Sequence, residues 1–256
     1  LLERDRTTHV AAVNGCPVIN PTRTGCLVGR ATRWFSSLRY QLNWGPMLFD
    51  GEAAVQRGAA NPTGPTPMFN HITYGGNAQY IRAKWKQTFY TRKATGQKIR
   101  GIARLSAARG TGDNPATPTT DEAFFPSHGR RYDGLERVGF GELFAATAYD
   151  AFGGQSTTTA SGLPVGVSGI IAIGMGITPP AWRGIIMDVD YFLYQAEKQT
   201  FGPNRTLGTE VDVRLRYDIK EHLQLRLTMA WFEAGAALNA EKPSARRYML
   251  ETIARF

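Results

Sequence analysis

Charged side chains recur at every second position in several segments of this sequence, with apolar residues between them. In residues 210–219 the charged positions include Glu210, Asp212, Arg214 and Arg216. Cations confined in a narrow passage attract anions and lower the barrier to their passage. The basic residues that we assign to one surface are Arg39, Arg82, Lys84, Lys86, Lys98, Arg100, Arg104, Arg214, Arg216 and Arg226, and the acidic ones are Asp188, Asp190, Glu210 and Asp212.

This charged surface has two interpretations, and the sequence leaves both open. In the first, the basic residues line a conduit that prefers anions. In the second, opposite charges on neighbouring strands pair with each other and only fill the wall. Arg214 and Arg216 have acidic residues on the preceding segment with which to pair. The surplus of bases on the segments of Lys84 and Arg100 is harder to neutralise locally.

The period of two predicts β-strands with one apolar and one charged face. Each run is about ten residues long, the length that a tilted strand needs to cross a bilayer. A soluble antiparallel sheet with one buried face is the alternative. Aromatic residues near the strand ends favour the membrane interpretation, since such girdles lie at bilayer interfaces. They are Trp44, Phe89, Trp182, Tyr217 and Phe256 at one edge, and Trp34 and Trp231 at the other.

We therefore expect one all-β domain over residues 1–256, an antiparallel transmembrane β-barrel with about nine strands. The expected strands are 33–44, 47–56, 77–90, 98–108, 167–177, 184–197, 210–219, 223–231 and 246–256. A final strand that ends on Phe256 is typical of the assembly signal of bacterial outer-membrane barrels. Such barrels have short periplasmic turns and an even number of strands. An odd count places Leu1 on the outer side, so further residues or another chain must complete the wall.

Two segments are expected to be loops outside the wall. Residues 1–32 contain Cys16 and Cys26; their spacing allows a disulfide in an oxidising compartment, and two unrelated thiols are the alternative. Counting 135–152 as a spanning strand inverts the loop-length rule in the first half, so 111–165 is predicted to be one long outer loop, part of which folds into the lumen. The constriction residues of this loop are Phe124, Phe125, His128, Arg130, Arg131, Tyr132 and Asp133.

The C-terminal part of the chain resembles a known family. The strand start Gly208-x-Glu210-x-Asp212, in the stretch 207–238, together with FFPSHGRRYDG at 124–134, is similar to the alginate-export family of outer-membrane porins. The likeness covers roughly 120–256. It implies an eighteen-stranded barrel that passively conducts an anionic polysaccharide through an arginine-lined lumen. Family members carry a long periplasmic segment before the penultimate strand, whereas 218–223 here is a tight turn.

Other classes of function have little support in the sequence. The formal charge is +9, yet the bases alternate along strands and do not gather in a nucleic-acid motif. The four histidines lack metal-ligand spacing and no Gly-x-Ser-x-Gly occurs, so we expect no enzyme, metal or cofactor. The expected partners are the outer-membrane bilayer, lipopolysaccharide, the barrel-assembly machinery and an anionic solute or polysaccharide. The alternative function is a plugged barrel that anchors or scaffolds other envelope proteins.

Overall fold

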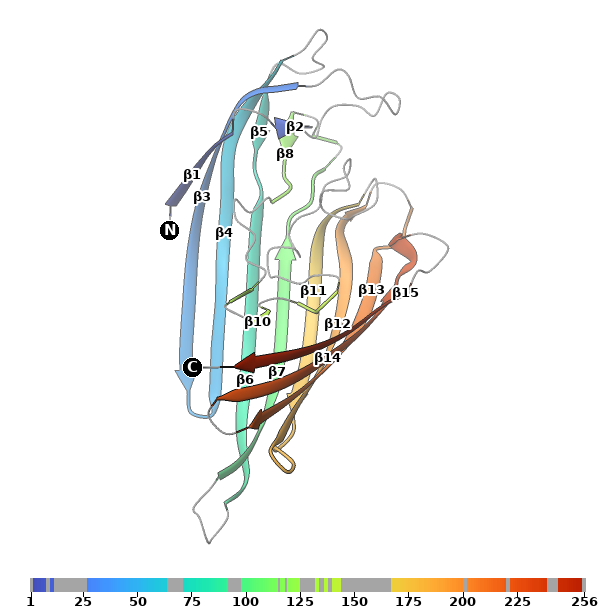
Figure 1. The fold of residues 1–256 in the computed structure, drawn as a ribbon. Coiled ribbons are helices and arrows are strands. Elements are labelled where there is room, and N and C mark those ends of the chain that lie inside the picture. The colour runs from blue at the N-terminus through green and yellow to red at the C-terminus, as the bar shows by residue number, and fades with distance from the viewer. Residues whose placement is uncertain are drawn as a thin grey trace.

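The protein is an all-β chain in which long strands lie side by side in one sheet (Figure 1). The computed structural model describes residues 2–7, 10–11, 27–63, 71–91, 98–114, 116–117, 119–124, 132–133, 136–137, 140–143, 167–199, 202–219, 222–238 and 244–254. Cys16, Cys26 and Phe256 lie outside the described residues, as do Phe125, His128, Arg130 and Arg131. Among the described residues, no helix is long and apolar enough to cross a membrane.

Nine long strands correspond to the nine predicted segments, which confirms the all-β antiparallel expectation. They are β3 (Leu27–Trp44), β4 (Met47–Thr63), β6 (Asn77–Thr91), β7 (Lys98–Gly110), β11 (Val167–Thr178), β12 (Ile185–Gln199), β13 (Thr206–Ile219), β14 (Leu223–Ala234) and β15 (Ser244–Ala254). The short elements are β1 (Leu2–Thr7), β2 (Val10–Ala11), β5 (Ile72–Tyr74), β8 (Thr120–Asp121), β9 (Tyr132–Asp133), β10 (Glu136–Arg137) and the 3-10 helix η2 (Ala236–Leu238).

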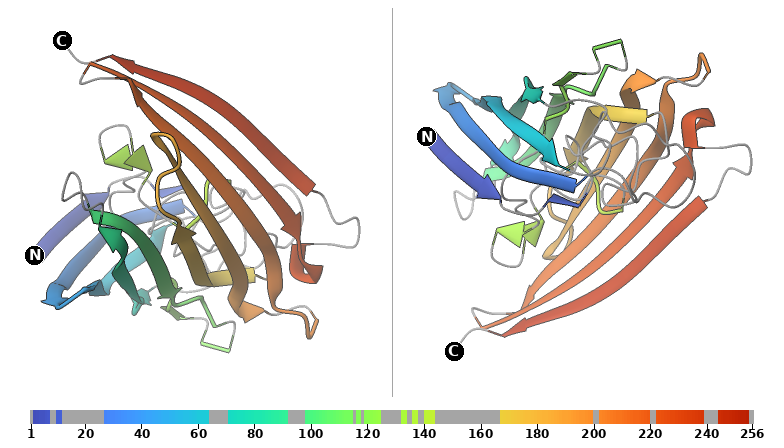
Figure 2. Two further views of the ribbon diagram at one scale, coloured as in Figure 1. Left: turned by 90° about the horizontal axis from the view of Figure 1, so that it is seen from below. Right: turned by 90° about the horizontal axis from the view of Figure 1, so that it is seen from above.

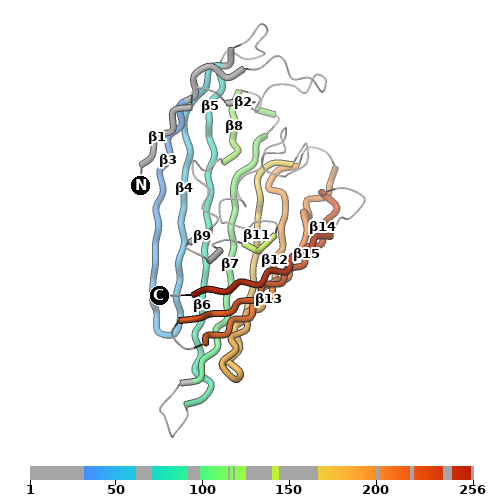
Figure 3. The backbone as a smooth tube through the Cα atoms, in the orientation of Figure 1, coloured from blue at the N-terminus to red at the C-terminus, as the bar shows by residue number. Residues whose placement is uncertain are grey.

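The strands form a 13-stranded sheet whose main path is β1-β3-β4-β6-β7-β11-β12-β13-β14-β15. Neighbours along this path are antiparallel. Within the described residues β1 and β15 do not pair with each other, so the sheet is open. The tube in Figure 3 shows β13, β14 and β15 inclined across the lower ends of the earlier strands.

The expectation that residues 1–32 form a loop is wrong for its two ends. β1 pairs with β3 from Leu2 opposite Ser36 to Thr7 opposite Ala31, and β3 itself begins at Leu27. Leu2 therefore lies part-way along β3, whereas Leu1 is outside the described residues. Four of the six residues of β1 (LERDRT) are charged and only Leu2 is apolar, so the sequence of this strand lacks the period-two signal.

Residues 59–75, whose Gly, Pro and Asn residues predict a loop, are also partly strand. β4 continues to Thr63, pairing with β3 up to that residue and with β5 from Gly58 to Ala60. In the sheet β7 pairs directly with β11, for example Gly110 with Ile170, so no described strand lies between them there. The described parts of 111–165 contain β8, which adds to β5 in parallel, and the separate hairpin of β9 and β10. Figure 2 shows the sheet curving around this region.

The curved sheet has two faces of different chemistry. We call the face toward the enclosed segments the concave face and define it by Phe35, Arg104 and Tyr194; the opposite, convex face is defined by Leu38 and Leu105. A core of aromatic and small residues fills the concave side where the connecting segments pack on it. Its members include Phe35, Ala78, Ala108, Phe124, Phe140, Ile170, Ala172, Phe192, Tyr194, Leu207 and Phe232.

Candidate functional site

The predicted charged residues share the concave face. Directly paired residues of an antiparallel sheet point to the same side. One such row runs across five strands from Lys84 through Arg104, Gly176 and Asp190 to Asp212. By the same register, Arg39, Arg82, Lys86, Arg100, Asp188, Glu210, Arg214, Arg216 and Arg226 belong to this face, and Lys98 occupies a concave position in β7.

Arg104 on β7 is the centre of an ion-pair network on this face. Its Nε donates to Asp190 Oδ1 at 3.0 Å and its Nη1 to Asp188 Oδ1 at 3.0 Å. The Thr178 hydroxyl accepts from Arg104 Nη1 and donates to Asp188 Oδ1. Arg214 Nη2 donates to the second oxygen of Asp190 at 3.2 Å. Gly176 lies between these strands, and a Cβ there would overlap Asp190 Oδ1. A glycine at this position therefore leaves room for β7 and β12 to interact across β11.

Several other predicted bases are also paired. Arg82 Nε donates to Asp50 Oδ2 on β4 at 2.9 Å. Arg226 lies 3.8 Å from Glu251 on β15, and Arg216 lies 3.8 Å from Asp218 on its own strand. The pairing interpretation is thus correct for Arg82, Arg104, Arg214 and Arg226. Asp50 and Glu251 were missed because a period of two gives the face of a residue but not its register with the next strand.

The remaining bases have no carboxylate partner in the described part of the chain. Lys84, Lys86 and Arg100 cluster on β6 and β7, and Arg39 lies on β3. No carboxylate among the described residues lies within 4.0 Å of their charged atoms. The concave face therefore has its excess of positive charge where the surplus was expected. The side chain of Lys98 is not described.

A cavity of about 420 Å³ opens on the concave side, at the end of the face next to the β11–β12 turn. Four of the predicted bases line it, together with one carboxylate and several small or apolar residues. The lining residues are Lys86, Arg100, Ile102, Arg104, Thr178, Pro179, Ala181, Ile186, Asp188 and Arg216. Such an arrangement can bind an anion, because the bases come from β6, β7 and β13 and surround one space.

A short segment of the long connection is bound to the wall of the same face. Glu210 Oε1 accepts the backbone N–H of Glu142 at 2.6 Å and of Leu143 at 2.7 Å. Tyr194 donates its hydroxyl to the Phe140 carbonyl at 2.6 Å and lies 3.1 Å from Glu210 Oε2. Tyr194, Glu210 and Phe140 are 0%, 1% and 2% exposed. We call residues 140–143 the latch.

The latch depends on a glycine and on a second anchor. Gly141 has a φ of 98°, a conformation that favours glycine, and a Cβ there would overlap the Tyr194 hydroxyl. Arg247 on β15 donates to the Glu142 carbonyl at 3.2 Å. The predicted list of constriction residues missed this segment. Its signal was the apolar Phe140 between two glycines, Gly139 and Gly141.

The predicted constriction residues are placed only in part. Phe124 is 2% exposed and its ring lies edge-on to Phe35 on β3, with 6.2 Å between the ring centres. Its backbone N–H donates to the Thr111 carbonyl at 3.0 Å, which holds this part of the connection against the end of β7. Tyr132 and Asp133 form β9, and their side chains are not described.

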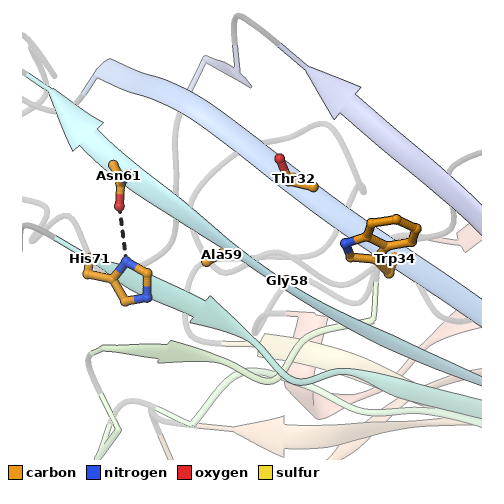
Figure 4. Close-up of a pocket in the computed structure, with 6 residues that line it drawn as sticks. All are labelled: Thr32, Trp34, Gly58, Ala59, Asn61 and His71. Carbon is orange, nitrogen blue, oxygen red and sulfur yellow. Dashed lines mark hydrogen bonds between the residues drawn. The ribbon is translucent and has the colours of Figure 1, made fainter.

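A second cavity, of about 400 Å³, lies toward the far ends of β3 and β4 on the convex side (Figure 4). Trp34, one of the predicted girdle residues, lines it with Thr32 and two small residues, Gly58 and Ala59. His71 Nδ1 lies 3.0 Å from Asn61 Oδ1, so these two polar side chains form a hydrogen bond with each other. None of the predicted charged residues reaches this cavity.

Among the described residues, no group of three or more His, Cys, Asp or Glu side chains is arranged to hold a metal ion. No protein-family model matches the chain, and no curated protein matches it.

Proposed function

We propose that this chain forms part of an outer-membrane β-barrel that conducts anionic solutes. The observation that carries the proposal is the distribution of side chains between the two faces. On the convex face Leu38, Trp44 and Leu250 are 73%, 71% and 74% exposed, whereas Asp190 and Glu210 on the concave face are 6% and 1% exposed. A soluble sheet buries its apolar face and exposes its charges. A wall between lipid and a polar lumen requires the reverse.

The lengths and ends of the strands support the same proposal. The nine long strands have 11 to 18 residues, enough for a tilted strand to cross the hydrocarbon core. Trp44, Phe89 and Tyr217 are exposed near the ends of their strands, and Trp182 is exposed in the β11–β12 turn. Aromatic side chains prefer such positions at the bilayer interface. Lipid and lipopolysaccharide would then contact the convex face.

In a bilayer the edges of β1 and β15 need partners. Each unsatisfied backbone group in hydrocarbon costs several kcal/mol, so only closed barrels span membranes with strands. The proposal therefore requires further strands, from a longer polypeptide or another chain, to complete the wall. The resemblance to the alginate-export porins implies eighteen strands in total.

The preference for anions rests on the excess of unpaired bases. Asp188 and Asp190 are both engaged by Arg104, and Asp50 by Arg82, so these acids do not offset Lys84, Lys86 or Arg100. Unbalanced cations in a narrow aqueous lumen raise the local anion concentration. The predicted solute class is anionic, either small ions or an anionic polysaccharide.

The second candidate function is a plugged barrel that serves as a scaffold for other envelope proteins. The latch supports this alternative, because residues 140–143 and Phe124 occupy part of the concave side. A plugged scaffold conducts no ions, whereas a conduit passes them past the bound segment. Electrical measurements therefore separate the two functions.

The test uses the purified full-length protein in planar bilayers under a KCl gradient. We expect open channels whose reversal potential indicates a preference for chloride. Lys84→Glu and Arg100→Glu should weaken or reverse this preference, because each replaces an unpaired cation on the concave face by an anion. Arg205→Glu makes the same change of charge outside this face, in the exposed β12–β13 connection, and is the matched control.

The conductance and the ion selectivity together distinguish the conduit from the scaffold. Electrically silent protein that is correctly folded would favour the scaffold function. Open channels with unchanged selectivity in both charge-reversal variants would contradict the assignment of Lys84 and Arg100 to the lumen. A loss of selectivity in Arg205→Glu of equal size would show that net charge alone sets the preference.

A further inference from the structure

The cavity lined by Lys86, Arg100, Arg104 and Arg216 holds more positive charge than the surrounding residues balance. Its single lining carboxylate, Asp188, already accepts from Arg104 and bonds to Thr178. Arg104 is in turn neutralised by Asp188 and Asp190. The charges of Lys86 and Arg100 remain without a carboxylate among the described residues.

Arg216 adds to this cavity a cation whose nearest carboxylate is distant. Its Nε is buried and has no hydrogen-bond partner in the described structure. The nearest carboxylate oxygen, on Asp218, lies 3.8 Å away, too far for a hydrogen bond. The side chain of Arg216 is 38% exposed, so an anion in the cavity can approach its cation, although not the buried Nε itself.

The number and type of the cations indicate the charge of the ligand. Arg100 and Arg216 each present a planar fork of donors that matches the oxygens of an oxyanion, which a spherical halide cannot match. Lys86 adds a third positive charge from a neighbouring strand. Three bases around one space suit an ion with two negative charges better than a singly charged carboxylate. About 420 Å³ accommodates a small ligand or one substituent of a larger one.

We propose that this cavity is a binding site for a doubly charged oxyanion of the phosphate class. Lys86, Arg100 and Arg216 form the site, and Arg104 is a fourth basic residue in its lining. The site rests on the proposed function, since it would lie in the lumen and take up solutes of this class there. Binding itself can be measured without any current. The two proposals can therefore fail independently.

The test is equilibrium binding of inorganic phosphate to the purified full-length protein in detergent, at pH 8, where phosphate is mostly dianionic. Chloride and acetate are the comparison ions. We expect phosphate to bind at least tenfold more tightly than either, because only phosphate offers both the double charge and several acceptor oxygens. Arg216→Gln, Arg100→Gln and Lys86→Gln should each weaken phosphate binding about tenfold, the usual effect of losing one charge-assisted hydrogen bond.

Arg205→Gln is the matched control, since it removes one cation far from the cavity and should leave phosphate affinity unchanged. Lys86 is exposed, so its variant also tests the site where Arg216→Gln fails to fold. Phosphate bound no more tightly than acetate, or unaffected by all three variants, would overturn the site. Anion-selective channels without phosphate binding would refute this site alone, whereas phosphate binding by a silent protein would refute only the conduit.

Discussion

Replacing Glu210 by alanine should release the latch from the wall. Glu210 is 1% exposed and accepts the backbone N–H groups of Glu142 and Leu143 at 2.6 and 2.7 Å. A hydrogen bond to a charged group contributes about 1.5–3 kcal/mol, so two of them hold this segment with roughly 3–6 kcal/mol. Each 1.4 kcal/mol changes an equilibrium tenfold, so we expect at least a hundredfold loss of local protection.

The assay is amide hydrogen exchange of residues 140–143 in the detergent-solubilised protein, because exchange reports local opening directly. Glu52→Ala is the control: Glu52 lies on the concave face of β4 and makes no ion pair among the described residues. Unchanged protection of Glu142 and Leu143 in Glu210→Ala would refute the latch. A conduit partly blocked by the latch should also show a larger single-channel conductance in this variant.

Two further predictions concern a carboxyl group and a glycine. Burial, and secondarily the charge of Asp121, raises the pKa of Asp113 to about 7. The folded state therefore favours the protonated carboxyl. Its contribution to the stability of this segment is fully present below the unfolded pKa of about 3.9 and is lost as the pH rises through the folded pKa of about 7. Asp113→Asn should remove this loss, seen as slower amide exchange than wild type at pH 8 and similar exchange at pH 4. Gly176→Ala should lower stability by about 1–3 kcal/mol, because the new methyl group displaces Asp190 from Arg104.

The predictions for Asp113→Asn and Gly176→Ala can each be contradicted by one result. Equal pH dependence of exchange in wild type and Asp113→Asn would contradict the role of burial at that carboxyl. For Gly176→Ala, thermal unfolding is compared with Gly75→Ala, where the added methyl meets only the Thr120 side chain at 3.7 Å. Equal unfolding temperatures for the two glycine variants would contradict a tight contact between β7 and β12 across β11.

The long strands and their faces could be predicted from the sequence, since alternation carries both pieces of information. Each of the nine predicted segments overlaps one long strand, and the predicted bases Arg82, Lys84, Lys86, Arg100 and Arg104 of β6 and β7 share one face. β1 was missed because its side chains are charged on both sides, and only backbone pairing with β3 makes it a strand.

The partners of the charged residues could not be predicted, because register between strands is not visible in a single strand. Arg104 reaches Asp188 and Asp190 across an intervening strand, through the space left at Gly176. The latch is of the same kind: Phe140 and Glu142 meet Tyr194 and Glu210, residues more than fifty positions away. Only the fold brings these groups together.

The central claim is that the convex face contacts lipid and the concave face contacts water. Spin labels on adjacent residues of β7, Leu105→Cys and Ser106→Cys, test it most directly in lipid vesicles, with Cys16 and Cys26 replaced by serine. We predict that the label at 105 is accessible to oxygen and shielded from a water-soluble nickel complex, and that the label at 106 shows the reverse. Free access of the nickel complex to position 105 would contradict the account.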